Sequence, residues 1–291
     1  DPDLQFRMGE EVGLQALIVG LPILWGPGLN THRSPYNGRS GDYYSEDPVL
    51  TGCVGMEFAI GAFKYGLLAS PKHFAFNDQE TNRSGIAPFM TEQRAREIEL
   101  RAFQIPMEAN KYNDHAPDYW TGNADHDFGM RGMMTSFSKI GAVECTASRG
   151  LIKDIAKNEW GFQGYIVTDI GDDTDLFASV VNAGATGYDL RGRFAESGFP
   201  NHTNDGEAIS VAMFSGDANI LTALKEAAHN TIWAFCQTNL MNAFNASTSY
   251  KSLTTWLRVA YTAAISVTSL LFVISAAMYT LSVIKSKKEK N

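Results

Sequence analysis

The sequence predicts an α/β fold, a (β/α) barrel of parallel strands, followed by a C-terminal transmembrane helix. Three observations predict this fold. Short apolar segments alternate with segments of helical composition over residues 1–190, which is typical of a parallel sheet or barrel. Polar residues follow the ends of several predicted strands, where a barrel assembles its site. An uncharged apolar segment near the C-terminus is long enough to cross a bilayer.

The composition limits the class of protein. The 291 residues are enough to bury the core of a barrel. The formal net charge of −8 argues against a nucleic-acid partner, because phosphate binding needs a basic surface. The cysteines are odd in number and widely spaced, which indicates neither a disulfide framework nor a CxxC metal site. The chain starts at Asp1 without a signal peptide, so we expect a fragment or a processed chain.

The first third of the chain alternates between helical and extended segments. Residues 4–19 have a helical composition, and residues 23–25 predict a short strand. Residues 26–47 are rich in Gly, Pro, Asn, Arg and Tyr, which is typical of a long functional loop. A helix is expected over residues 47–64. The strand after it, residues 67–70, runs into Pro71, Lys72 and His73.

The middle of the chain continues the same alternation. Thr91 is a suitable N-cap for a helix that runs to about residue 111 with one apolar face. Residues 132–137 predict the next strand, and Ser148 begins a helix that ends before Gly161. After the strand that ends at Asp169, residues 184–190 predict one more short strand behind a brief helix.

The segment from Gly164 to Asp169 is the most informative part of the chain. It is a short run with β-branched residues, bounded by glycines, that ends in a carboxylate. An acid at the end of a buried strand is where barrel enzymes place catalytic groups. The alternative is a turn or N-cap acid, because Asp172 and Asp173 follow closely and Asp favours such positions.

Polar residues recur at the ends of four predicted strands. They are Lys72-His73, Phe137-Ser138, Asp169 and Asp189. A barrel requires this recurrence, because its site is assembled from the carboxyl ends of several strands. A doubly wound sheet is the competing fold, but neither a GxGxxG loop nor a P-loop supports a nucleotide site in it.

The C-terminal region predicts a membrane anchor. Residues 259–284 contain no charged residue, and the basic tail that follows predicts a cytoplasmic C-terminus by the positive-inside rule. The alternative is a buried helix of a soluble protein. An amphipathic helix is expected over residues 217–241. The predicted divisions are a barrel over residues 1–190, a post-barrel helix and linker over 191–255, a transmembrane helix over 256–285 and a basic tail over 286–291.

A set of motifs along residues 1–190 resembles glycoside hydrolase family 3, in the order and spacing of that family. The motifs are Gly26-Pro27-Gly28-Leu29-Asn30-Thr31-His32-Arg33-Ser34-Pro35, Gly38-Arg39, Tyr44-Ser45-Glu46-Asp47-Pro48, Lys72-His73-Phe74 with Asn77, Gln79-Glu80, Asn82-Arg83, Met134-Thr135-Ser136-Phe137, and Glu159-Trp160-Gly161-Phe162-Gln163-Gly164 before Thr168-Asp169. The resemblance implies an incomplete (β/α)8 barrel of the TIM type and hydrolysis of β-glycosidic bonds with retention.

The resemblance also implies roles for particular residues. Asp169 matches the nucleophile, one of two carboxyls that a retaining enzyme holds about 5–5.5 Å apart. Four cationic or imidazole side chains match positions that bind the reacting sugar: Arg39, Lys72, His73 and Arg83. Without the resemblance, Lys72-His73 would be an ordinary polar pair at a strand end and Arg83 a solvated charge. We expect Glu80 to support Arg83 or Lys72, and Asp189 is either a strand-end residue or a turn acid.

The sequence departs from the family pattern in four respects. Phe137 stands where most members have Tyr, and Ile170 replaces an aromatic residue that stacks on the leaving sugar. The early Asp that binds the sugar, and the domain that holds the acid/base Glu, have no counterpart in this chain. This arrangement resembles a permuted subgroup in which the second domain precedes the barrel and a membrane helix closes the chain. The acid/base would then lie upstream of Asp1.

The sequence therefore predicts the barrel part of a retaining β-glycosidase, similar to β-glucosidases and β-xylosidases, which acts on terminal β-linked sugars of an oligosaccharide or other β-glycoside. Neither a redox cofactor nor a metal is expected. The predicted location is the cell membrane, single-pass, with the barrel outside the cytoplasm. The fragment alone is expected to lack leaving-group protonation, which contributes about 10²–10⁴-fold. The alternative is a membrane-tethered glycan-binding protein without turnover. The sequence leaves the sugar, its linkage and the oligomeric state open.

Overall fold

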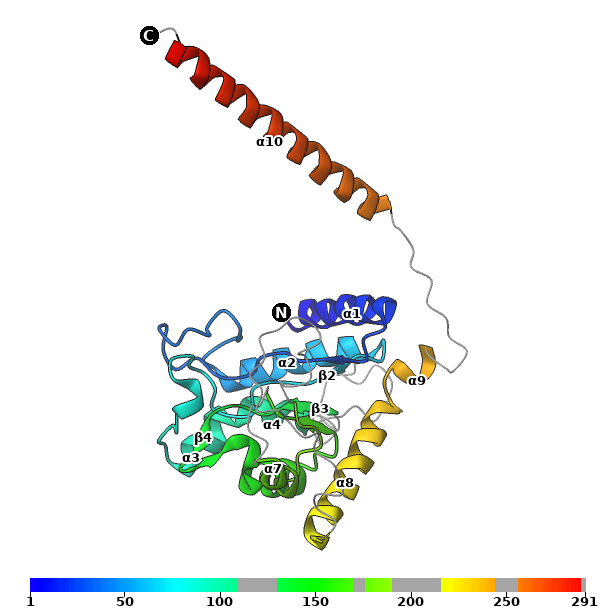
Figure 1. The fold of residues 1–291 in the computed structure, drawn as a ribbon. Coiled ribbons are helices and arrows are strands. Elements are labelled where there is room, and N and C mark those ends of the chain that lie inside the picture. Colours follow the sequence, from blue (N-terminus) through cyan, green and yellow to red (C-terminus); the bar gives the residue numbers. More distant parts are fainter. Residues whose placement is uncertain (109–129, 170–175, 190–215, 244–255, 289–291) are drawn as a thin grey trace. The chain divides into compact units, whose positions relative to one another are not determined.

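A computed structural model of the chain describes residues 1–108, 130–169, 176–189, 216–243 and 256–288. The chain divides into two compact units, Asp1–Phe244 and Asn245–Asn291. The first unit contains parallel strands with helices packed against them (Figure 1). The second contains one long helix.

Four short strands of the first unit run parallel in chain order. They are β1 (Ile23–Leu24), β2 (Leu68–Ala69), β3 (Gly132–Met134) and β6 (Tyr165–Val167). β1 pairs with β2 and β3 pairs with β6, while the Met134 N–H donates to the Pro71 carbonyl and joins the two pairs. Gly187 continues the series as a parallel bridge to Val167. Because the strand order never reverses, the strands form part of a barrel wall rather than a doubly wound sheet.

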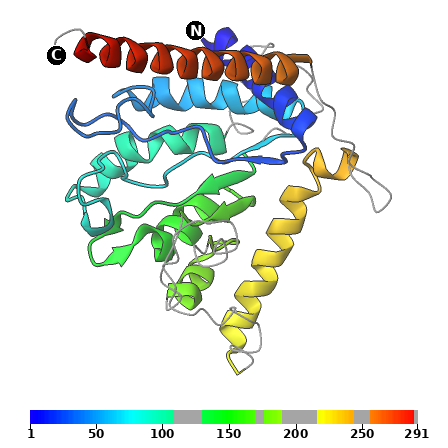
Figure 2. The ribbon, with the colours of Figure 1, turned by 45° about the horizontal axis from the view of Figure 1, so that its top comes forward.

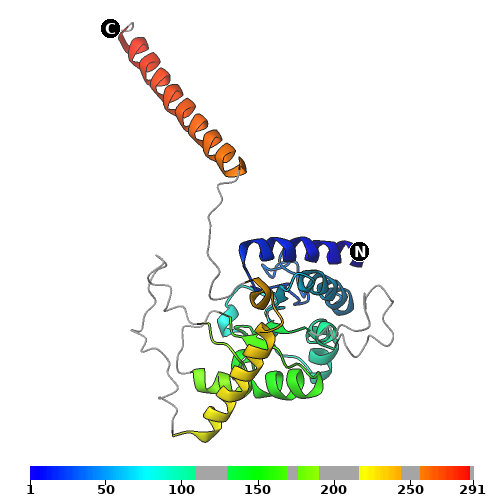
Figure 3. The same cartoon turned by 90° about the vertical axis from the view of Figure 1, so that its right-hand side faces the viewer.

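The first two helices lie where the sequence predicts them. α1 (Pro2–Val19) and α2 (Pro48–Phe63) lie side by side, as Figures 2 and 3 show. The Asp47 side chain accepts the N–H groups of Val49 and Leu50, and this cap together with a proline at the first turn fixes the start of α2. α1 and α2 approach closely because glycines face the partner backbone, as Gly61 does at the carbonyl of Phe6.

The predicted helix after Thr91 begins where expected but is not uniform. Thr91 caps α3 (Glu92–Arg94), which continues as a π-helix over Ala95–Glu99 and then as α4 (Arg101–Met107). The helix after Ser148 is likewise π-helical over Gly150–Glu159. The remaining elements of this region are α7 (Phe177–Ala183), the antiparallel hairpin of β4 (Lys139–Ile140) and β5 (Val143–Glu144), and the 3₁₀ turns Arg83–Gly85 and Cys145–Ala147.

The core lies between the strands and these helices. The ring of Phe74 is fully buried, and its centroid lies 5.3 Å from that of Phe103 and 5.9 Å from that of Trp160. Both pairs meet edge to face, a favourable geometry for aromatic rings. The residue next to the predicted sugar-binding pair, Phe74, is therefore held by packing from two different helical segments.

The amphipathic helix expected over residues 217–241 is α8 (Ala218–Phe235), followed by the short α9 (Leu240–Ala243). The C-terminal part of α8 and the residues just after it contact the segments at the amino ends of the strands. Trp233 lies under the Arg131 guanidinium before β3, and Phe235 packs on Tyr165 at the start of β6. The Asn239 N–H donates to the Gly66 carbonyl before β2. The Asn239 side chain donates to the Leu21 carbonyl before β1.

Two predicted strands are shorter than expected. Of the predicted strand over residues 184–190, the described residues up to 189 contribute the Gly187 bridge, after the chain leaves α7 through Gly184 at φ 105°. The strand over residues 132–137 ends as a ladder at Met134, and Thr135 continues it as a bridge to Phe74. The predicted membrane segment lies in α10 (Trp256–Lys288), whose stretch Val259–Leu281 is long and apolar enough to cross a bilayer.

Candidate active site

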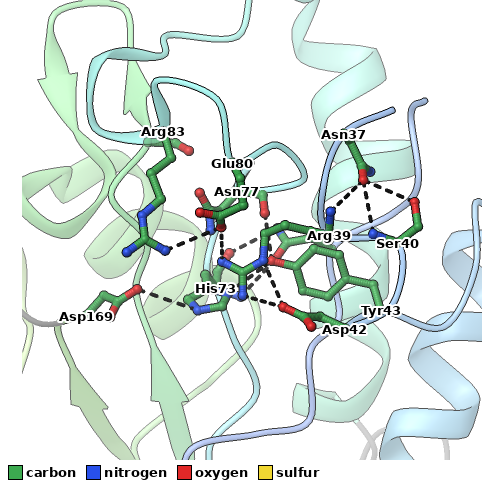
Figure 4. Close-up of polar contacts among 12 residues, drawn as sticks. Asn37, Arg39, Ser40, Asp42, Tyr43, His73, Asn77, Glu80, Arg83 and Asp169 are labelled. Atoms are coloured by element: carbon green, nitrogen blue, oxygen red, sulfur yellow. Dashed lines mark hydrogen bonds and ion pairs between the residues drawn. The ribbon is translucent and has the colours of Figure 1, made fainter. Parts of the chain in front are cut away.

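The carboxyl ends of β2 and β6 bring His73 and Asp169 together. The His73 Nε2 lies 3.5 Å from the Asp169 Oδ2 (Figure 4). The His73 side chain is buried, whereas that of Asp169 keeps 15% of its surface exposed. Because both strands end at the same rim, two residues far apart in sequence lie close together there. This is the arrangement that the barrel prediction requires.

His73 is a neutral side chain at physiological pH. Burial lowers its pKa to about 3, and the nearby charges of Arg39, Lys72 and Arg83 act in the same direction. Its Nδ1 lies 3.1 Å from the Tyr43 hydroxyl, which donates to the Asn77 carbonyl at 2.7 Å. A neutral imidazole offers one donor nitrogen and one acceptor nitrogen. It is therefore better suited to hydrogen bonding than to acting as a positive charge.

The His73 backbone is fixed as firmly as its ring. The Asn30 side chain accepts the His73 N–H at 2.8 Å and donates to the His73 carbonyl at 3.1 Å. Asn30 comes from the loop after β1 and is itself buried. A bidentate amide contact of this kind sets the orientation of the peptide, so neighbouring strand ends together determine where the imidazole lies.

Arg39 is a buried cation held on two sides by carboxylates. Its Nε and Nη2 donate to the Asp42 Oδ2 at 3.0 and 2.7 Å, and its Nη1 donates to the Glu80 Oε1 at 2.6 Å. The guanidinium also lies over the Tyr43 ring. Asn37 shapes the loop beside it, because its side chain accepts the N–H groups of Arg39 and Ser40. The long loop therefore presents Arg39 in one orientation (Figure 4).

Arg83 joins the same network from the loop after β2. It donates to the Glu80 Oε1 at 3.3 Å, and its guanidinium carbon lies 4.6 Å from the centre of the Phe137 ring. Glu80 thus supports Arg83, as expected, and also supports Arg39. Phe137 contributes its ring face to Arg83, a cation–π contact that needs no hydroxyl group. Within the part of the chain that the structure describes, the Lys72 ammonium makes no ion pair.

Asp189 lies beside the end of β6. Its N–H donates to the Thr168 hydroxyl at 2.9 Å, and burial together with the negative charge of Asp169 raises its pKa. Asp169 and Asp189 are therefore neighbours at one rim, and Asp189 fits the strand-end alternative better than an isolated turn acid. Ile170, Asp172 and Asp173 lie outside the described residues.

The first 113 residues are similar to a known family. Residues 1–113 match the model of the glycosyl hydrolase family 3 N-terminal domain. This match and the relatives below support a place in glycoside hydrolase family 3. Probable beta-glucosidase J of Emericella nidulans is 32% identical over 184 residues, which cover 63% of this chain and 19% of that protein. The exo-alpha-(1->6)-L-arabinopyranosidase of Bifidobacterium longum is 32% identical over 185 residues, covering 63% of this chain and 22% of that protein.

The fold agrees with solved structures of the family. Beta-glucosidase 3B from Thermotoga neapolitana in complex with glucose superimposes with a TM-score of 0.66 at 25% identity, covering 84% of this chain and 31% of that one. The described unit is thus a TIM-barrel-like α/β fold. The chain spans about a fifth of the length of the curated relatives named above.

The structure adds residues that sequence reasoning did not single out. Asn30, Asp42 and Tyr43 orient His73 or Arg39, although the sequence places them only within a motif or a loop. Their signal in the sequence is slight: each lies in the loop over residues 26–47, where Asn, Asp and Tyr are common. Only the folded loop shows which of these side chains turn towards the strand ends.

Proposed function

We propose that this chain is the barrel part of a membrane-anchored retaining β-glycosidase, with Asp169 as the nucleophile. The observation that supports this most is the position of the Asp169 carboxylate, at a strand end 3.5 Å from a neutral, buried His73. The two groups lie where a sugar ring could meet both. Relatives with beta-glucosidase in their names make a β-glucoside the first substrate to test.

The proposed step is a displacement at the anomeric carbon. The Asp169 Oδ attacks that carbon and forms a glycosyl ester, while the bond to the leaving oxygen breaks and the oxygen takes a proton from an acid. Water then adds to the anomeric carbon, gives a proton to the conjugate base of that acid, and releases the Asp169 carboxylate. Asp169 must be ionised for the first step, because only the carboxylate is a nucleophile.

The sugar would be oriented by the side chains around Asp169. Arg39 and Arg83 are fixed by Glu80, and His73 is fixed by Asn30 and Tyr43. A sugar presents several hydroxyl groups, so donors held rigidly by other contacts bind it with little ordering cost. We assign Arg39, Lys72, His73 and Arg83 to this role.

The acid that protonates the leaving oxygen is proposed to lie outside this chain, on a domain upstream of Asp1. α10 is proposed to anchor the protein, with the barrel outside the cytoplasm and the basic tail inside. Loss of leaving-group protonation is the expected defect of this chain by itself, a factor of about 10²–10⁴. An activated leaving group reduces that dependence, which determines the choice of test compound.

The test is covalent trapping in the whole membrane protein. It is incubated with 2,4-dinitrophenyl 2-deoxy-2-fluoro-β-glucoside, and peptide mass spectrometry locates any adduct. The proposal expects one sugar on Asp169 and none in Asp169→Asn. Asp154→Asn, an exposed acid on the Gly150–Glu159 helix, is the matched control and should label fully. Folded protein that binds the sugar reversibly without an adduct, with the glucoside or the xyloside, contradicts the enzyme and favours a glycan-binding protein.

A further inference from the structure

The rim of the barrel opposite the candidate site exposes apolar side chains. Ile18, Val19 and Leu21, at the end of α1 and just beyond it, are 75%, 61% and 55% exposed, and Met241 in α9 is 59% exposed. The hydrogen bond from the Asn239 side chain to the Leu21 carbonyl brings the two segments together. Figures 1 and 2 both draw α9 beside the end of α1. Large apolar groups gathered at one end of a protein indicate an interaction surface.

Two segments of this rim carry no charge in their sequence. No Asp, Glu, Lys or Arg occurs over residues 12–32, which include the end of α1 and β1, or over residues 227–250, which include the second half of α8 and all of α9. A water-exposed surface normally intersperses charges with its apolar groups. Trp233 in α8 adds interfacial character, because its side chain is 37% exposed. A tryptophan ring suits the boundary between lipid and water.

The chain itself indicates what covers this rim. α9 ends at Ala243, and α10, with its apolar stretch of membrane-spanning length, begins at Trp256. The intervening residues 244–255 span at most about 40 Å when fully extended, so the rim cannot move far from a bilayer that holds α10. The predicted sugar-binding residues, in contrast, follow the carboxyl ends of the strands, at the other rim.

We propose that the rim formed by Ile18, Val19, Leu21, Leu240 and Met241 rests on the lipid surface, so that the Asp169 rim points away from the membrane. This inference rests on the membrane anchoring proposed above and goes beyond it, because an anchor alone leaves the barrel free to turn. The rim contacts the interface through apolar and aromatic side chains without spanning it. The sugar site then opens towards solvent, where glycosides arrive.

The test uses the full chain in phosphatidylcholine vesicles and a bimane label at one cysteine. In a background of Cys53→Ser and Cys236→Ser, Ile18→Cys or Met241→Cys reports on the rim. Tyr36→Cys, at a 94% exposed position in the long loop, is the matched control. Lipids brominated near the headgroup are expected to quench the two rim labels at least two-fold more than the control label.

Separate readouts distinguish the anchor from the rim contact. A chain that washes off the vesicles in alkaline carbonate contradicts the anchoring proposal. A chain that stays bound, but whose rim labels are quenched no more than the Tyr36→Cys label, overturns the inference while the anchor stands. Self-quenching that rises with the ratio of protein to lipid would assign the rim to a second copy of the chain, and this also overturns the lipid contact.

Discussion

The Glu80 Oε1 lies 2.6 Å from the Arg39 Nη1, which links the loop after β2 to the long loop after β1. The same oxygen accepts from Arg83. The Glu80 carboxylate therefore holds Arg39 and Arg83, which are two of the four side chains that we assign to sugar binding. Because Arg39 is buried, losing one of its counter-charges should affect its position more than the loss of an ordinary surface pair would.

Glu80→Gln tests this relationship. The amide keeps the size of the side chain but removes the charge that holds Arg39 and Arg83, so we expect kcat/KM for an aryl β-glucoside to fall about 10–100-fold. Glu144→Gln, which removes the partner of Lys139 on the β4–β5 hairpin, is the control and should change kcat/KM less than two-fold. Equal losses in the two variants, measured by steady-state kinetics, would contradict the role of Glu80.

The stability of the protein should depend on His73 at acid pH. Its folded pKa of about 3 lies below the ordinary value of 6.5, so between these values the unfolded chain binds more protons. Protonation therefore favours unfolding as pH falls through this window, by about 1.4 kcal/mol per pH unit for a single group. In urea titrations at pH 6 and pH 4, wild type should lose more stability than His73→Gln. Equal losses of stability in wild type and in His73→Gln would mean that His73 is not held neutral.

Glu57 shows the opposite dependence. It is 3% exposed in α2, one of its carboxyl oxygens has no hydrogen-bond partner among the described residues, and burial with the charge of Asp3 raises its pKa to about 7. The folded state then retains a proton that the unfolded chain releases above about pH 4.5, so stability falls as pH rises through 7. We expect Glu57→Gln to stabilise the protein at pH 8 by about 1–3 kcal/mol and to change little at pH 5. Denaturant unfolding at both pH values checks this, and an unchanged difference between them contradicts it.

The contact of α1 with α2 should tolerate no side chain at Gly61. A Cβ there would clash with the Phe6 carbonyl oxygen, and a backbone atom cannot move aside as a flexible side chain can. Gly61→Ala is expected to cost about 1–3 kcal/mol, since overpacking outweighs the gain in helix propensity. Gly41→Ala meets no atom within 4 Å and is the control. Thermal unfolding that ranks the two variants the other way round would contradict this packing.

Much of this arrangement could be predicted because strand ends and caps are local features. Asp47 and Thr91 cap their helices as expected, and β6 ends just before Asp169 because the apolar run ends there. Other features depend on long-range contacts. Which segments meet after folding determines the π-helical turns, the bridge at Gly187 and the two hydrogen bonds between the Asn30 side chain and the His73 backbone. No local pattern of residues specifies such contacts between distant segments.

The central claim is that Asp169 attacks the anomeric carbon, and chemical rescue tests it most directly. Asp169→Gly in the whole protein should hydrolyse 2,4-dinitrophenyl β-glucoside at least 10³-fold more slowly than wild type. Azide should restore release of dinitrophenol, because the small anion fits in the space of the lost carboxylate. The product should be the α-glucosyl azide, identified by its anomeric proton in the NMR spectrum. A variant that retains wild-type turnover, or a rescued product with the β configuration, would contradict the assignment of Asp169.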